Sequence, residues 1–130
     1  MKFLHLSDLH IGKRVNEVSM LDDQSDILRQ ILELADAERP DAVLLAGDIY
    51  DKSVPSNEAV ALFDDFLVQL AARRLPVLLI SGNHDSQQRV DCYRGLLRRQ
   101  NIHMVGMPPR TPEEKIEKIV MKDSFGEVNF

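Results

Sequence analysis

The chain has 130 residues, of which 44% are hydrophobic and 28% are charged, and its formal net charge is −5. This balance is typical of a globular fold and argues against a disordered chain, and the length suits one domain or part of one. No apolar run approaches the ~20 residues that a membrane span needs, so no membrane association is expected. The acidic charge neither indicates nor excludes a nucleic-acid partner, because bound metal ions would offset acids in a site. A single cysteine, Cys92, rules out an internal disulfide and indicates a reducing cytoplasm.

Short apolar runs alternate with amphipathic segments over the first 105 residues, which predicts a sheet with crossover helices. A strand over Lys2–Leu6 is followed by a helix over Met20–Glu38, whose apolar positions at helical spacing include Ile27 and Leu34. The uninterrupted apolar run Ala42–Ala46 is typical of a buried parallel strand.

The same cycle then repeats twice. Pro55–Ser56 predicts the start of a second helix with Val60 in its buried stripe, and Val77–Ile80 is the next strand. Asp85 with Gln88 resembles a capping box for a third helix.

That third helix carries Tyr93 and Leu96 among its apolar positions, and it leads to a fourth strand over Ile102–Val105. Cys92 lies within it and is expected to be buried as a small apolar residue. Three consecutive βαβ units imply right-handed crossovers and a mainly parallel sheet.

Beyond Gly106, a proline-rich loop precedes a predicted strand over Ile116–Met121. Asp123–Gly126 supplies a turn before another strand, which opens at Val128–Phe130. A chain end inside an apolar strand suggests a truncated domain, because that strand would have too little sheet to pair with. We therefore expect an α/β fold in which residues 1–130 form the N-terminal part of one domain, with no second domain.

Each of the first three predicted strands ends in a short polar motif, namely Ser7–His10, Gly47–Asp51 and Gly82–Asp85. Alone, an Asp-x-His or a Gly-Asp pair carries little weight, because such residues are common in turns. The carboxyl ends of parallel strands meet at one edge of a sheet, so Asp, His and Asn side chains from three segments should converge there. This convergence predicts a metal site.

The residue types define the chemistry. Oxygen and imidazole ligands without thiolate suit Mn²⁺, Mg²⁺, Fe or Zn²⁺. A carboxylate such as Asp48, in the middle motif, can bridge two ions ~3.5–4 Å apart, and such a pair activates a water for in-line attack on phosphorus. Lys13 and Arg14 follow the first motif directly and are candidates to contact a substrate phosphate.

The motifs resemble those of the calcineurin-like metallophosphoesterases, whose pattern is D-x-H, then G-D-x-x-D, then G-N-H-D or G-N-H-E. The fuller strings look most like those of the SbcD-type nucleases, and they are His5–Lys13, Gly47–Asp51 running on to Pro55–Ser56, and Gly82–Ser86. The resemblance covers residues 1–105 and implies the N-terminal βαβαβ half of an α/β sandwich. It also implies hydrolysis of DNA phosphodiester bonds, as a double-strand exonuclease and a single-strand or hairpin endonuclease in repair and recombination.

By this resemblance, Asp8 and His10 bind one metal ion, Asp48 bridges, and Asn83 binds the second, with Mn²⁺ as the expected metal. The implied partners are DNA and an SbcC-like ATPase of the SMC family, and a homodimer is a further candidate.

By the same resemblance, His84 contacts the scissile phosphate and protonates the leaving oxygen, and either Asp51 or Asp85 orients its ring. A cap or turn role for these two acids stays open.

The sequence departs from the family in one respect. The family completes its metal shell with later histidines in G-H and G-H-x-H motifs, which this sequence lacks, since His103 has no preceding glycine. We therefore expect weak or no activity from the chain alone. A metallophosphatase acting on small molecules or phosphoproteins, and a non-catalytic partner-binding fragment, remain alternatives. A doubly wound nucleotide-binding domain is disfavoured, because no Gly-x-Gly-x-x-Gly follows the first strand.

Overall fold

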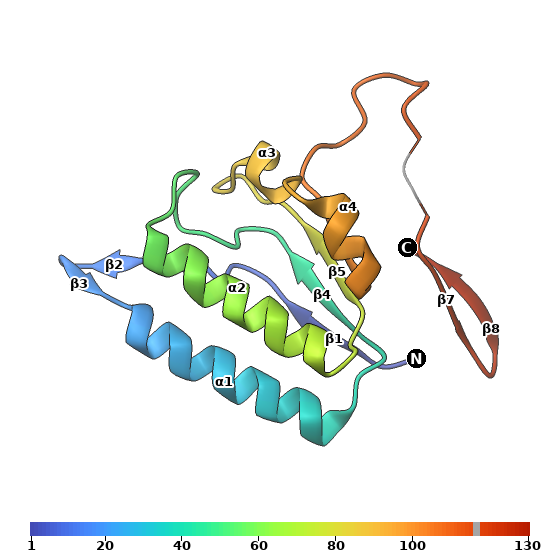
Figure 1. Cartoon of the computed structure of the whole chain (residues 1–130), viewed down its shortest axis with the longest axis horizontal. Helices are drawn as coiled ribbons and strands as arrows, with labels where there is room; N and C mark the ends of the chain where they lie inside the picture. Colours follow the sequence, from blue (N-terminus) through green and yellow to red (C-terminus); the bar gives the residue numbers. More distant parts are fainter. Residues whose placement is uncertain (116–117) are drawn as a thin grey trace.

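A four-stranded parallel sheet forms the centre of the computed structural model, which describes residues 1–115 and 118–130 (Figure 1). In spatial order its strands are β1 (Phe3–Leu6), β4 (Ala42–Ala46), β5 (Val77–Ile80) and β6 (Ile102–Val105). All neighbouring strands are paired in parallel. The predicted α/β fold with a mainly parallel sheet is therefore confirmed.

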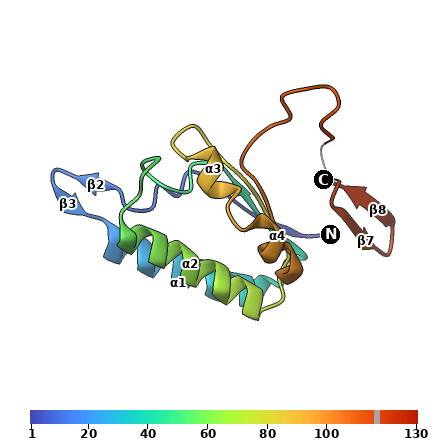
Figure 2. The same ribbon diagram turned by 45° about the horizontal axis from the view of Figure 1, so that its top comes forward.

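Two long helices, α1 (Leu21–Glu38) and α2 (Asn57–Ala72), form the first two crossovers. The strands follow one another in chain order, so right-handed crossovers place both helices on the same face of the sheet. Figure 1 shows them side by side, and Figure 2 shows both on one face of the sheet. Ser56 caps α2 as predicted, because its Oγ accepts a hydrogen bond from the Ala59 N–H at 3.3 Å. No helix among the described residues is long and apolar enough to cross a membrane.

The core lies between the helices and one face of the sheet. Val43 and Leu45 of β4 and Val77 and Leu79 of β5 alternate inward and are at most 1% exposed. Three residues that were predicted to lie on the buried sides of the two helices are exposed, because each helix buries only the side that faces the sheet. These outward-facing residues are Ile27, Leu34 and Val60.

The segment between β5 and β6 differs from the single helix that was predicted. It contains three short elements, α3 (Gln87–Val90), α4 (Arg94–Leu97) and the 3₁₀ helix η1 (Arg98–Gln100). The break comes at Tyr93, whose φ is +60° and whose side chain is 73% exposed, and Leu96 is exposed beyond it. Cys92 beside the break is also exposed, so its predicted burial was wrong.

Two antiparallel hairpins lie outside the main sheet. The first was not predicted and pairs β2 (Arg14–Val15) with β3 (Val18–Ser19), directly after the first motif. Its turn residues, Asn16 and Glu17, both have positive φ angles, which is what a tight hairpin turn needs.

The second hairpin pairs β7 (Val120–Asp123) with β8 (Gly126–Asn129) around the predicted turn. The strand predicted over Ile116–Met121 begins later than expected, and its residues 116–117 lie outside the described part of the chain. The strand predicted to open at Val128–Phe130 instead runs from Gly126 to Asn129.

Candidate metal centre

The first two motifs continue the pairing of β1 and β4 beyond the ends of these strands. The Asp8 N–H donates to the Gly47 carbonyl at 3.2 Å, and the His10 N–H donates to the Asp48 carbonyl at 2.9 Å. These bonds hold the two motif loops side by side at the carboxyl edge of the sheet.

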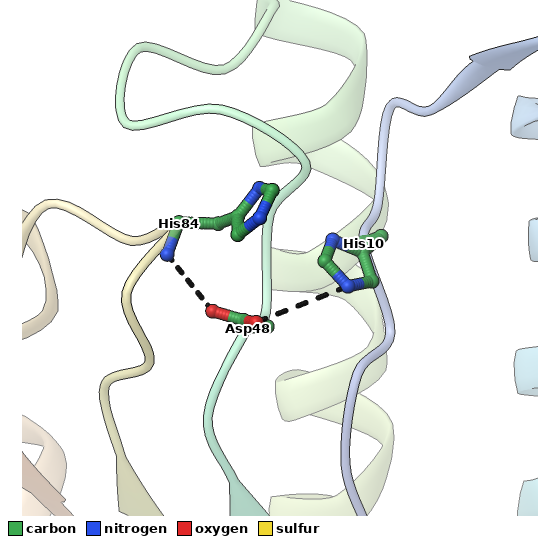
Figure 3. A group of neighbouring side chains, drawn as sticks. All are labelled: His10, Asp48 and His84. Atoms are coloured by element: carbon green, nitrogen blue, oxygen red, sulfur yellow. Dashed lines mark hydrogen bonds and ion pairs between the residues drawn. The ribbon is translucent and has the colours of Figure 1, made fainter.

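Three side chains from three different loops meet at this edge. His10 follows β1, Asp48 follows β4 and His84 follows β5, and Figure 3 shows them turned toward one another. One donor atom from each lies within 4.8 Å of the other two. The Asp48 Oδ2 is 3.9 Å from the His10 Nε2, and the His84 backbone N–H donates to the Asp48 Oδ1 at 2.9 Å. The centroids of the two imidazole rings are 4.7 Å apart.

Two further carboxylates flank His10. The Asp8 Oδ1 lies 3.9 Å from its Nε2, and the Asp51 Oδ1 lies 3.7 Å from its Nδ1. That Nδ1 is buried and has no hydrogen-bond partner among the described residues. Together with Asp48, three carboxylates therefore surround one imidazole, which concentrates negative charge that a cation would offset.

These donors fit a divalent cation. Two atoms that each lie ~2.0–2.2 Å from one ion are at most about 4.4 Å apart. The two 3.9 Å distances from His10 to Asp8 and Asp48 satisfy this limit, although they are too long for hydrogen bonds. Asn83 is exposed and lies at the rim, where it lines an open cavity of about 500 Å³ together with Asp51 and His84.

The imidazole of His84 is held through one nitrogen. Its Nδ1–H donates to the backbone carbonyl of Asp51 at 2.8 Å. This hydrogen bond, and more weakly the carboxylates of Asp48, Asp51 and Asp85, raise the pKa of His84. With Nδ1 engaged, Nε2 is the ring nitrogen that can face a substrate.

Asp85 is 7% exposed and binds the backbone of two motif loops. Its Oδ2 accepts hydrogen bonds from the N–H groups of Ile49 at 3.1 Å and Gly82 at 2.8 Å, and its Oδ1 accepts one from Tyr50 at 2.9 Å. Asp85 thus joins the second motif to the third. The capping box predicted for it was wrong, because Ser86 caps α3 instead.

Replacing Asp85 with alanine is expected to lower the free energy of unfolding by about 3–5 kcal/mol, because three backbone N–H groups lose their acceptor in a largely buried place. Asp85→Asn keeps one oxygen and should cost less. Urea denaturation followed by circular dichroism measures both, with the exposed Asp65→Ala of α2 as the matched control. A loss below about 1 kcal/mol for Asp85→Ala, similar to a surface substitution, would contradict this role.

The candidate ligands have an unusual backbone conformation. Asp8, His10 and Asp48 have φ angles of +54°, +43° and +49°. The left-handed region is uncommon for residues other than glycine, although Asp and His enter it more readily than most. Strained residues that gather at one place are typical of functional sites, where the surrounding structure holds them.

Lys13 and Arg14 are exposed and start the β2–β3 hairpin. The Lys13 N–H donates to the His10 carbonyl at 3.0 Å. This hydrogen bond fixes the start of the hairpin, with the side chains of Lys13 and Arg14, next to the first motif. The Arg14 guanidinium donates to the Glu17 carbonyl across the hairpin turn.

Motif reasoning missed Gln24 of α1. Its side chain binds the backbone of Leu9, His10 and Gly12. A signal was present in the sequence, because Gln24 stands one turn before Leu28 and is therefore a polar residue in the buried stripe of α1.

Comparison with known proteins identifies the family of this chain. Residues 1–125 match the family described as calcineurin-like phosphoesterase. Over 92 residues the chain is 40% identical to the SbcD subunit of the SbcCD nuclease from Staphylococcus epidermidis (strain ATCC 12228 / FDA PCI 1200), an alignment that covers 70% of this chain and 25% of that protein. The chain therefore spans about a quarter of the length of this curated relative.

Proposed function

Because the chain belongs to the calcineurin-like phosphoesterase family, we propose that it carries the N-terminal part of the metal site of a DNA nuclease. The observation behind the proposal is the convergence of His10, Asp48 and His84, whose donor atoms lie within 4.8 Å of one another. The similarity to a nuclease subunit favours a DNA phosphodiester over a small phosphate monoester or a phosphoprotein as the substrate.

In this proposal Asp8 and His10 would hold one divalent ion, Asn83 would hold the second, and Asp48 would serve both. Mn²⁺ is the proposed metal, since the donors are carboxylate, amide and imidazole groups without thiolate. When bound, two such ions would polarise a phosphoryl oxygen and supply a water of lowered pKa.

His84 acts on the leaving oxygen. Its Nδ1–H is held by the Asp51 carbonyl, so the transferable proton sits on Nε2 of the imidazolium. In the metal-free chain, the hydrogen bond to the Asp51 carbonyl raises the pKa of His84 and so favours this protonated form. Asp51 therefore orients the ring, and Lys13 and Arg14 bind phosphates of the DNA backbone.

We extend the proposal to the protein as a whole on the basis of the relative that it resembles. It works in the cytoplasm with an SbcC-like ATPase of the SMC family, as a double-strand exonuclease and a single-strand or hairpin endonuclease in DNA repair and recombination. Residues 1–130 are part of one nuclease domain, which forms a homodimer.

A nuclease assay tests this function. The protein assayed is the full translation product of the coding sequence that contains residues 1–130. With Mn²⁺ and a labelled hairpin DNA we expect nicked or shortened products, and none from the Asp48→Ala variant. Turnover of p-nitrophenyl phosphate without DNA cleavage would indicate a phosphatase instead. Metal-dependent turnover of neither substrate would support a partner-binding fragment.

Metal binding by the 130-residue chain itself is expected to be weak or confined to one site. Asp8, His10, Asp48 and Asn83 are four proposed ligands for two ions, and each ion takes about four to six donors. Calorimetric titration with Mn²⁺ should therefore show no tight two-site isotherm. Two tight sites would mean that another residue of the chain, or a second copy, completes the shell.

A further inference from the structure

Gln24, in the first turns of α1, binds the loop that carries the first motif. Its Nε2 donates to the carbonyls of Leu9 at 3.2 Å and His10 at 2.8 Å, and its Oε1 accepts from the Gly12 N–H at 2.9 Å. One side-chain amide thus satisfies three backbone groups within four consecutive residues.

This pattern requires an amide of this length. A glutamine side chain offers two N–H donors and a carbonyl acceptor, whereas a carboxylate offers no donor and an apolar side chain offers neither. Gln24 also stands in line with Leu28 and Leu32 on the buried side of α1. A polar group in such a place is unfavourable unless it is hydrogen-bonded, so its contacts with the loop account for its presence there.

We infer that Gln24 is a positioning residue for the metal centre. It binds the carbonyl of His10, whose φ is +43°, and so holds the loop in the conformation that turns the imidazole toward Asp48. The inference rests on the proposed metal site, because Gln24 acts on the ion only through the backbone of a ligand. Contacts that orient metal ligands typically change metal affinity by about 10–100-fold when they are lost.

Two substitutions remove this contact in different ways. Gln24→Met has a similar length and makes no hydrogen bond, while Gln24→Glu keeps an acceptor but places a carboxylate against two carbonyls. The matched controls are Gln30→Met and Gln30→Glu, because Gln30 lies exposed on the same helix, where its amide donates to the Asp26 carboxylate at 2.7 Å. In calorimetric titrations of the chain with Mn²⁺, we expect both Gln24 variants to bind about 10–100-fold more weakly than wild type. The Gln30 variants should differ from wild type by no more than about twofold.

A second measurement needs no metal. The ring centroids of His10 and His84 are 4.7 Å apart, which is close enough for a nuclear Overhauser effect between ring protons in the metal-free chain. We expect that signal to disappear in the Gln24 variants and to persist in the Gln30 variants, with circular dichroism showing that all four remain folded. Should Gln24→Met fail to fold, Gln24→Glu provides the same comparison.

The two measurements separate the inference from the proposed function. No Mn²⁺ binding by wild type would count against the metal site, and the ring signal would still decide the role of Gln24. Wild-type Mn²⁺ affinity together with an unchanged His10–His84 signal in both Gln24 variants would overturn the inference.

Discussion

Replacing His84 with alanine or glutamine is expected to lower the kcat of DNA cleavage by about 10²–10⁴ and to leave the metal content nearly intact. The reason lies in how the imidazole of His84 is held. Its Nδ1–H donates to the Asp51 carbonyl at 2.8 Å, which leaves Nε2 as the nitrogen that can give a proton to the substrate. The loss would then reflect the missing proton donor at the leaving oxygen.

Asp48→Ala is the comparison that gives this result its meaning. In the proposed metal centre Asp48 would serve both ions, so its removal should abolish metal binding and cleavage together. Elemental analysis of the purified variants, alongside their cleavage rates, measures the two effects separately. The pair of variants distinguishes the chemical step from metal assembly.

His84 is itself a candidate ligand, because it lies next to His10 and Asp48 with one donor atom from each within 4.8 Å of the others. Loss of metal from His84→Ala as complete as that from Asp48→Ala would make His84 a ligand. The role as proton donor would then be wrong.

Gly82→Ala is expected to disrupt the metal centre without removing any of its ligands. A Cβ at this position would lie 2.1 Å from the Asp48 Oδ1 and 2.3 Å from the Asp48 backbone nitrogen. The second and third motifs would have to move apart, and forcing extra atoms into a packed place costs about 1–3 kcal/mol or more. Bringing the two motifs back together on metal binding would cost a similar free energy. We therefore expect metal affinity to fall by roughly 5-fold to 100-fold, since 1.4 kcal/mol corresponds to a factor of ten.

Gly95→Ala is the matched control for this substitution. Gly95 lies in α4, and a Cβ there would meet no atom within 4 Å. Alanine is favoured over glycine in a helix, so this variant should be more stable by about 0.5–1 kcal/mol and should bind metal like wild type. Calorimetry with Mn²⁺ and thermal denaturation measure both variants. Wild-type metal affinity in Gly82→Ala would show that the two loops are not held as closely as the structure indicates.

The central sheet was largely predictable from local pattern. Ala42–Ala46, Val77–Ile80 and Ile102–Val105 were predicted with the bounds that the structure shows. Each is a short, mostly apolar segment flanked by turn residues, and such segments have few alternatives to a strand once they alternate with amphipathic helices.

Other elements were not visible in the pattern. Tyr93 and Leu97 keep the spacing of a helix, and nothing in that spacing signals the left-handed conformation that ends one helix and starts the next. The β2–β3 hairpin is formed by Arg14–Ser19, in which both valines are exposed, so it has no buried face to produce an alternating pattern.

The site was predictable in the part that depends on strand ends, and not in the part that depends on tertiary hydrogen bonds. His10, Asp48 and His84 follow apolar runs directly, and the rules of parallel sheets bring such positions together. Asp85 gave no such indication, because a carboxylate before a helix looks the same in sequence whether it caps the helix or accepts three N–H bonds from neighbouring loops. Only the folded arrangement distinguishes these roles.

Left-handed backbone beyond two neighbouring strands places a double demand on the candidate ligands. At Asp8, His10 and Asp48 the chain turns with φ angles of +54°, +43° and +49°, shortly after the parallel pair β1 and β4 ends. Each of these positions needs a side chain that can bind a cation and a residue that tolerates a positive φ. A β-branched residue or a longer acid in its place would meet at most one of these two requirements.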